Sequence, residues 1–136
     1  MQPKVVLANG CFDPFHYGHL LHLRAARELG DVLVVSVTRD KHVNKGPGRP
    51  VFTEKQRCEM LRALAIVDEV VLADNALDAL QQVDPDVCVK GREYEGNIEA
   101  EHESYCRARG IEIAFTGTQK FSSTDLLHHY DRLRKG

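Results

Sequence analysis

The chain has 136 residues, the size of one ordinary domain with one core, and we expect a single domain over residues 1–136. Hydrophobic residues make up 43% of the chain and charged residues 28%, proportions that are typical of a globular domain and that exclude a disordered chain or a coiled coil. The formal net charge of −2 gives no basic footprint, so nucleic acid is not an expected partner.

The start of the chain carries no signal-peptide pattern, and no apolar run approaches the roughly 18 residues that a membrane helix needs. We therefore expect a cytoplasmic location and no membrane partner. The four cysteines are widely separated, and Cys58 and Cys88 lie inside apolar patterns where a thiol acts as a small hydrophobic group. A disulfide framework is not expected.

Short apolar runs and helical patterns alternate from the start of the chain. The runs at residues 4–9 and 31–38 are rich in β-branched residues and predict two buried strands. Between them, apolar residues recur at three- and four-residue steps from His19 to Leu29, and Gly30 follows as a stop signal. This pattern predicts a helix over 19–29.

After the glycine- and proline-rich stretch "GPGRP", Thr53 and Gln56 form a capping-box pattern that predicts a helix over residues 54–65. A similar pattern, Ser122 and Asp125, predicts a last helix that ends near Lys135. The elements expected between these two helices are a strand over residues 68–73, a helix over 76–83, a strand over 86–90, a helix over 98–109 and a strand over 111–115.

Strands that alternate with helices predict parallel pairing, because a parallel neighbour needs a crossover of a dozen or more residues. We therefore expect an α/β fold, a Rossmann-like doubly wound sheet of five parallel strands with helices on both faces. Such sheets bind ligands beyond the carboxyl ends of the strands, where the strand order reverses, and the loop after the first strand borders that crevice. This loop is the stretch "ANGCFDPFHYGHL" at residues 8–20.

The residues of this loop suit a phosphate site. Gly10 gives the backbone freedom past the strand, Pro14 fixes a turn, and Gly18 permits close approach to the backbone near a helix start. A helix start offers free N–H groups to an anion, and His16 and His19 can face the same anion with ring N–H donors. We interpret the loop as a nucleotide-phosphate site.

The same residues allow two other interpretations. The loop could merely join a strand to a helix, with His16 and His19 as ordinary surface and helix-start residues. A zinc site could add Cys11 and His22, but Cys11 follows the strand directly, His22 lies a turn further along the helix, and there is no second cysteine cluster. We therefore expect no protein-bound metal.

The stretch "GCFDPFHYGHL" resembles the signature of the cytidylyltransferase-like nucleotidyltransferase superfamily, in which a histidine, any residue, a glycine and a histidine follow the first strand. Later stretches resemble, in order, blocks of the glycerol-3-phosphate cytidylyltransferases and the heptose-1-phosphate adenylyltransferases: "TRDKHVNKGPGRPVFTEKQRCEML", "IVDEVV", "DVCVKG" and "SSTDLL". The resemblance covers most of the chain.

This resemblance implies an enzyme that moves a nucleoside monophosphate from a nucleoside triphosphate to a phosphorylated small molecule and releases pyrophosphate. It favours ATP, with CTP still open, and a sugar 1-phosphate such as heptose 1-phosphate as the acceptor. A polyol or amino-alcohol phosphate, such as glycerol 3-phosphate with CTP, is the alternative. The triphosphate would carry Mg²⁺, and the family implies a homodimer.

The resemblance also implies a role for each matching residue. The expected catalytic residues are His16, His19, Lys45 and Arg57. The expected nucleotide-binding residues are Gly10, Cys11, Phe12, Gly18, Lys90, Gly91, Ser122, Ser123 and Thr124. The expected substrate-binding residues are Asp13, Asp40, Arg92 and Glu93.

Two departures from the family patterns bear on the acceptor. The stretch "KGREYEGN" has Arg92 and Glu93 where the heptose enzymes tend to carry a glycine and an aspartate. Gly117 and Thr118 stand where the glycerol-phosphate enzymes carry an arginine and a threonine, which disfavours a glycerol-phosphate assignment.

Two other classes of function are compatible with parts of the pattern. The stretch "HYGH" also resembles a signature of class I aminoacyl-tRNA synthetases, but the lysine-rich signature loop, an anticodon-binding part and a basic footprint are missing. A non-catalytic nucleotide-binding module would keep the fold and the phosphate loop. The presence of both histidines favours the transferase.

Overall fold

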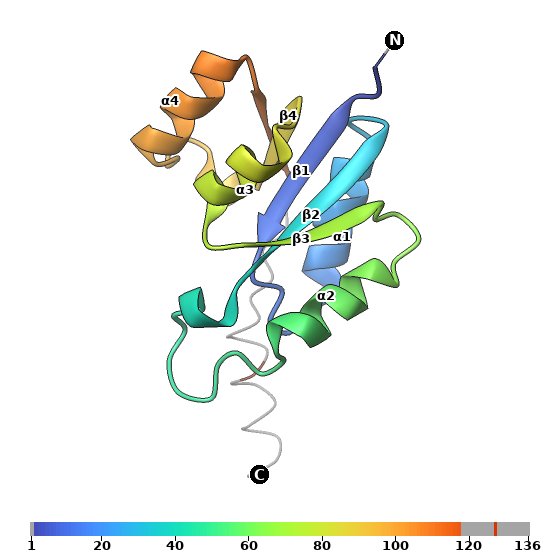
Figure 1. Cartoon of the computed structure of the whole chain (residues 1–136), viewed down its shortest axis with the longest axis vertical. Helices are drawn as coiled ribbons and strands as arrows, with labels where there is room; N and C mark the ends of the chain where they lie inside the picture. Colours follow the sequence, from blue (N-terminus) through green and yellow to red (C-terminus); the bar gives the residue numbers. More distant parts are fainter. Residues whose placement is uncertain (1, 118–126, 128–136) are drawn as a thin grey trace.

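The sheet has the predicted parallel arrangement. The computed structural model describes residues 2–117 and 127. Within them, five parallel strands follow the order β3-β2-β1-β4-β5 (Figure 1), which confirms the predicted fold class. The strands are β1 (Val5–Gly10), β2 (Val32–Thr38), β3 (Glu69–Ala73), β4 (Val87–Gly91) and β5 (Glu112–Thr116). The predicted last helix and Ser122, Ser123 and Thr124 lie outside the described residues.

Helices cover both faces of the sheet, as Figure 1 shows. The four α-helices of the described part are α1 (Tyr17–Arg27), α2 (Glu54–Arg62), α3 (Ala76–Val83) and α4 (Ala100–Arg109). Leu23 of α1 and Leu61 of α2 belong to one buried apolar cluster, whereas Leu80 of α3 and Cys106 of α4 belong to a second one. Alternate β1 residues enter the two clusters, because successive side chains of a strand face opposite sides.

Four helix ends differ from the prediction, and one of them is the end of α1, at Arg27 instead of residue 29. Helix α1 begins at Tyr17, two residues early, because His16 caps it. Helix α2 ends at Arg62 instead of residue 65, and α4 begins at Ala100 instead of residue 98. Two short 3₁₀ turns follow strands: η1 (Asp40–His42) comes one residue after β2, and η2 (Arg92–Tyr94) follows β4 directly.

The strand order reverses at β1, which lies between β2 and β4. The carboxyl ends of these parallel strands lie at one edge of the sheet, so the segments that follow β1, β2 and β4 meet there. The loop after β1 and the long connection from η1 to α2 lie at this edge (Figure 1). No helix in the described part of the chain has the length and apolar character needed to cross a bilayer.

Candidate active site

Two histidines cap helix α1 reciprocally. The backbone N–H of His16 donates to Nδ1 of His19 at 3.1 Å, and the backbone N–H of His19 donates to Nδ1 of His16 at 3.4 Å. This is the geometry of a capping box, which Ser or Thr and Glu or Gln usually form. The two rings stack with their centroids 3.8 Å apart and their planes 16° apart.

The capping box decides which ring nitrogen carries the proton. A neutral imidazole has one N–H donor and one acceptor nitrogen, and here Nδ1 of both rings accepts from the backbone. The hydrogen-bond network therefore assigns the proton of each ring to Nε2. Both histidines then carry an Nε2–H donor at the N-terminus of α1, where helix N–H groups already favour an anion.

Both imidazoles are neutral at physiological pH. Burial is the main cause that lowers the pKa of His19 to about 3, and the neighbouring His16, His22 and Lys45 contribute to this lowering because they disfavour a second positive charge. Burial and the Lys45 charge also lower the pKa of His16. A bound phosphate would act in the opposite direction, because an anion stabilises the imidazolium.

Aromatic rings account for much of the burial of His19. The Phe12 ring meets the His19 ring edge-on at a centroid distance of 5.0 Å, and the Phe15 ring stacks on it at 5.7 Å. Phe12 has a φ of +53° and a buried side chain, and a Cβ on Gly10 would lie 3.0 Å from its ring. Gly10 thus makes room for Phe12, a role that the sequence did not indicate.

Lys45 lies in an exposed loop near the two histidines. Gly46 and Gly48 follow it in the chain with φ values of +96° and +76°. No atom lies within 4 Å of the position that a Cβ would take on either glycine. Because its charge acts on the pKa of both His16 and His19, Lys45 lies within electrostatic range of the pair. The structure therefore brings three of the four predicted catalytic residues together.

Arg57, the fourth, lies beneath the site with a fully buried side chain. Its Nη1 donates to the carbonyls of Cys11 and Thr38, both at 2.8 Å, and its Nε donates to the Phe52 carbonyl at 3.0 Å. Its Nη2 donates to the Asp40 carboxylate at 2.6 Å. These four bonds tie the loop after β1 to the end of β2 and to the segment before α2, which is the geometry of a positioning residue.

Asp13 occupies a similar place. Its buried carboxylate accepts from the backbone N–H groups of Val51 and Phe52 at 2.8–2.9 Å and from Nε of Arg49 at 3.0 Å. Burial alone would raise the pKa of Asp13, but the bonds from Phe52, Val51 and Arg49 outweigh it and lower the pKa overall. We predicted a substrate contact for this residue, and the structure instead directs its carboxylate to residues 49–52.

The ends of β4 and β5 carry a second polar cluster. Nδ1 of His22, on α1, is hydrogen-bonded to the Thr116 hydroxyl, which lies 3.5 Å from the Lys90 carbonyl. A Cβ on Gly91 would lie 2.5 Å from a carboxylate oxygen of Glu93, so that carboxylate lies over Gly91. The ammonium of Lys90 lies 5.9 Å from the centroid of the Tyr94 ring.

Charges in this cluster act on one another. Burial lowers the pKa of His22, the Glu93 carboxylate opposes that shift, and the Lys90 ammonium adds to it. Burial also lowers the pKa of Lys90. The sequence analysis weighed His22 only as a possible zinc ligand, which it set aside, and did not consider Thr116. The spacing of His16, His19 and His22, three residues apart each time, was the available signal.

The remaining predicted residues lie at the same edge of the sheet. Gly18 is the second residue of α1, and half-buried Cys11 contributes its carbonyl to Arg57. Arg92 is exposed in η2. No group of three or more histidine, cysteine or acidic residues in the described part of the chain could hold a metal ion.

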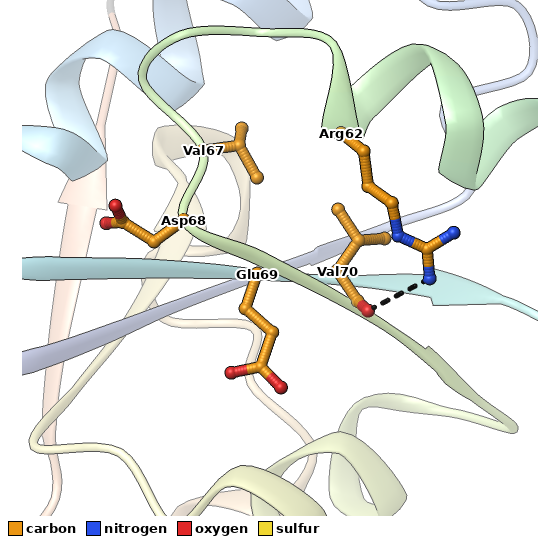
Figure 2. Close-up of a pocket in the computed structure, with 5 residues that line it drawn as sticks. All are labelled: Arg62, Val67, Asp68, Glu69 and Val70. Atoms are coloured by element: carbon orange, nitrogen blue, oxygen red, sulfur yellow. Dashed lines mark hydrogen bonds between the residues drawn. The ribbon is translucent and has the colours of Figure 1, made fainter.

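A separate hollow of about 370 Å³ lies at the start of β3 (Figure 2), lined by Arg62, Val67, Asp68, Glu69 and Val70. Figure 2 shows Arg62 bonded to the Val70 carbonyl, at 3.5 Å. Because this hollow is at the amino end of a strand, it lies at the edge opposite to the histidine pair. None of its residues carries a predicted role.

A doubly wound sheet in which a helix N-terminus suited to anion binding follows the first strand is typical of a nucleotide-binding α/β domain. The sequence profile of the family described as Cytidylyltransferase-like matches residues 7–127. The chain therefore belongs to the cytidylyltransferase-like family of nucleotidyltransferases.

Individual relatives support this membership. The chain is 42% identical over 125 residues to a protein named Bifunctional protein HldE from Azotobacter vinelandii. This match covers 89% of this chain and 26% of that protein. It is 39% identical over 128 residues to the protein of that name from Desulfatibacillum aliphaticivorans, and this match covers 91% of this chain and 26% of that protein. The chain thus spans about a quarter of the length of these curated relatives.

A solved structure has the same fold over its full length. It is described as the lipopolysaccharide core biosynthesis protein from Thermoplasma volcanium GSS1, and it is 30% identical to this chain with a TM-score of 0.73. The match covers 88% of this chain and 100% of that one.

Proposed function

We propose that this protein transfers a nucleoside monophosphate from a nucleoside triphosphate to a phosphorylated small molecule. The observation that carries the proposal is the histidine pair of α1, whose Nδ1 atoms accept from the helix backbone and whose Nε2 atoms hold the protons. Two neutral donors fixed at a helix N-terminus suit the triphosphate, and family membership supports the same reaction.

The reaction needs little covalent chemistry from the protein. An acceptor phosphate oxygen attacks the α-phosphorus and forms the new P–O bond, while the bond from the α-phosphorus to the bridging oxygen breaks and pyrophosphate leaves with the electron pair. The attacking oxygen is already ionised, so no general base is required. Catalysis then rests on alignment and on neutralising charge that develops on the phosphoryl oxygens.

In this reaction His16 and His19 donate from Nε2 to phosphoryl oxygens, and Lys45 brings its charge to the phosphates from the loop that contains Gly46 and Gly48. Arg57 and Asp13 hold the segments that frame them. Mg²⁺ belongs to the nucleotide substrate in this scheme, bound by the triphosphate oxygens, and it supplies further positive charge there.

For the substrates, we favour a sugar 1-phosphate such as heptose 1-phosphate as the acceptor and ATP as the donor. The sequence blocks that resemble heptose-1-phosphate adenylyltransferases support this choice, as does the structural relative named for lipopolysaccharide core biosynthesis. Glycerol 3-phosphate with CTP is the second candidate, and Gly117 in place of the arginine of those enzymes weighs against it.

The test is pyrophosphate release from ATP and from CTP, with Mg²⁺, against heptose 1-phosphate, glycerol 3-phosphate and phosphoethanolamine. Release should require one nucleotide and one acceptor together. The H19A variant should lose at least about a hundredfold in turnover, the effect of removing one transition-state donor. Nucleotide binding with no release for any pair would favour a non-catalytic binding module, and full activity in H19A would contradict the mechanism.

A further inference from the structure

Helix α1 carries a third histidine, His22, beyond the pair that caps it. His22 is half-buried, and its Nδ1 is hydrogen-bonded to Thr116 at the end of β5. Among the described residues, Nε2 of His22 has no hydrogen-bond partner, although it is not a buried, unsatisfied atom. Nδ1 is therefore anchored, whereas Nε2 has no partner in the described part of the chain.

The charged neighbours of His22 come from the segment after β4. Its pKa responds to the Glu93 carboxylate and to the Lys90 ammonium, so both charges lie within electrostatic range of its ring. The Glu93 carboxylate lies over Gly91, at the carboxyl end of β4. The cluster of His22, Lys90, Glu93 and Thr116 thus lies at the carboxyl ends of β4 and β5, and His22 is three residues from His19 on α1.

Two of the four residues predicted to bind the acceptor are occupied elsewhere. Asp13 is buried and bound to residues 49–52, and Asp40 is paired with Arg57. The other two, Arg92 and Glu93, are exposed on η2. Among the described residues, the β4–β5 side therefore still offers polar groups to an acceptor.

We infer that His22 is a specificity-determining residue for the acceptor, with Nε2 hydrogen-bonded to a hydroxyl of a sugar phosphate and Nδ1 anchored by Thr116. The inference rests on the proposed function and names the part of the site that reads the acceptor. A neutral imidazole and a carboxylate are both suited to hydroxyl groups. The ammonium of Lys90 suits an anionic sugar phosphate and opposes a cationic amino-alcohol phosphate.

Two substitutions of His22 separate its two nitrogens. In H22N the short amide replaces the Nδ1 side, so the contact with Thr116 is kept and the Nε2 position is lost. In H22Q the longer amide reaches the Nε2 position and leaves Thr116 without its partner. A structural role for His22 would depend on the Thr116 contact, whereas acceptor recognition depends on the Nε2 position.

The experiment measures KM for acceptor and for nucleotide in both variants, with melting temperatures as a folding check. Acceptor KM should rise about tenfold in H22N, the scale of one lost hydrogen bond, and only about threefold in H22Q, with nucleotide KM unchanged in both. An acceptor that lacks the recognised hydroxyl should bind wild type more weakly but bind H22N with no further loss. A greater effect in H22Q than in H22N, an equal rise in both KM values, or no change in acceptor KM would overturn the inference.

The outcome stays separable from the proposed function. Calorimetry with a non-hydrolysable nucleoside triphosphate present measures sugar 1-phosphate binding to wild type, H22N and H22Q without turnover. If wild type binds the sugar phosphate and releases no pyrophosphate, the proposed reaction fails while the His22 comparison still stands. If wild type turns over and the two variants bind the acceptor as wild type does, the inference fails and the reaction stands.

Discussion

Replacing Arg57 with alanine tests whether this residue supports the site or contacts the phosphates. The guanidinium is fully buried, and R57A would leave the carbonyls of Cys11, Thr38 and Phe52 without their donor. Asp40, its carboxylate partner, is 38% exposed and can be rehydrated, so the unpaired buried carbonyls dominate the cost.

Leaving a carbonyl acceptor without its donor costs about 1–3 kcal/mol, so the three carbonyls together should cost about 3–5 kcal/mol, out of the roughly 5–15 kcal/mol that a domain has in total. With a urea m-value of about 2 kcal/mol/M, the unfolding midpoint of R57A should fall by about 1.5–2.5 M. Arg62, on the same helix, provides the control because its side chain is exposed, and R62A should stay within about 0.5 kcal/mol of wild type. If R57A keeps the wild-type midpoint but loses turnover, Arg57 contacts substrate and the positioning role is wrong.

Three further predictions concern the histidines and Gly91. H16A should lose about 1 kcal/mol of stability because it loses the helix cap, whereas H16N should keep that stability because asparagine is a good N-cap residue. Both variants should lose about a hundredfold in turnover, because both lack the Nε2 donor. Equal activity in H16N and wild type would exclude a role for Nε2. His19 and His102 have pKa values lowered to about 3 and about 4, mainly by burial, so the unfolded chain binds more protons below pH 6.5. Stability, followed as the urea midpoint, should therefore fall between pH 7 and pH 4, less steeply in H19N, and a midpoint that rises on acidification would contradict this. G91A would displace the Glu93 carboxylate, so acceptor KM should rise about threefold to tenfold while the melting temperature changes little; a shift in nucleotide KM alone would place Glu93 with the nucleotide.

The fold was predictable because its signal is local. Apolar β-branched runs that alternate with helical patterns define parallel strands, and each of the five strands lies within a residue or two of its predicted range. Helix ends were less accurate where an unusual residue acts. Histidine is not among the favoured N-cap residues, so nothing in the sequence indicated that His16 would begin α1 two residues early.

The site was predictable only in part, because its supporting bonds join distant residues. The proximity of His16 and His19 could be predicted from the sequence, because side chains three residues apart at a helix start lie side by side. It could not show that Asp13 would bind the backbone of Phe52, 39 residues away, or that Arg57 would reach the carbonyl of Cys11, 46 residues away. Burial of such groups depends on how the loops fold together, so the bonds by which Asp13 and Arg57 support the loops could not be predicted from the sequence.

The most direct test of the central claim follows the α-phosphate itself. Wild-type protein is incubated with Mg²⁺, heptose 1-phosphate and ATP that is labelled at its α-phosphate. The products are then separated and identified by mass spectrometry. We predict that the label appears in a nucleoside diphosphate sugar, one molecule for each pyrophosphate released, and that H19A forms it at least about a hundredfold more slowly. Label that stays in ATP, or that appears as free nucleoside monophosphate without joining any phosphorylated acceptor, would contradict the proposed transfer.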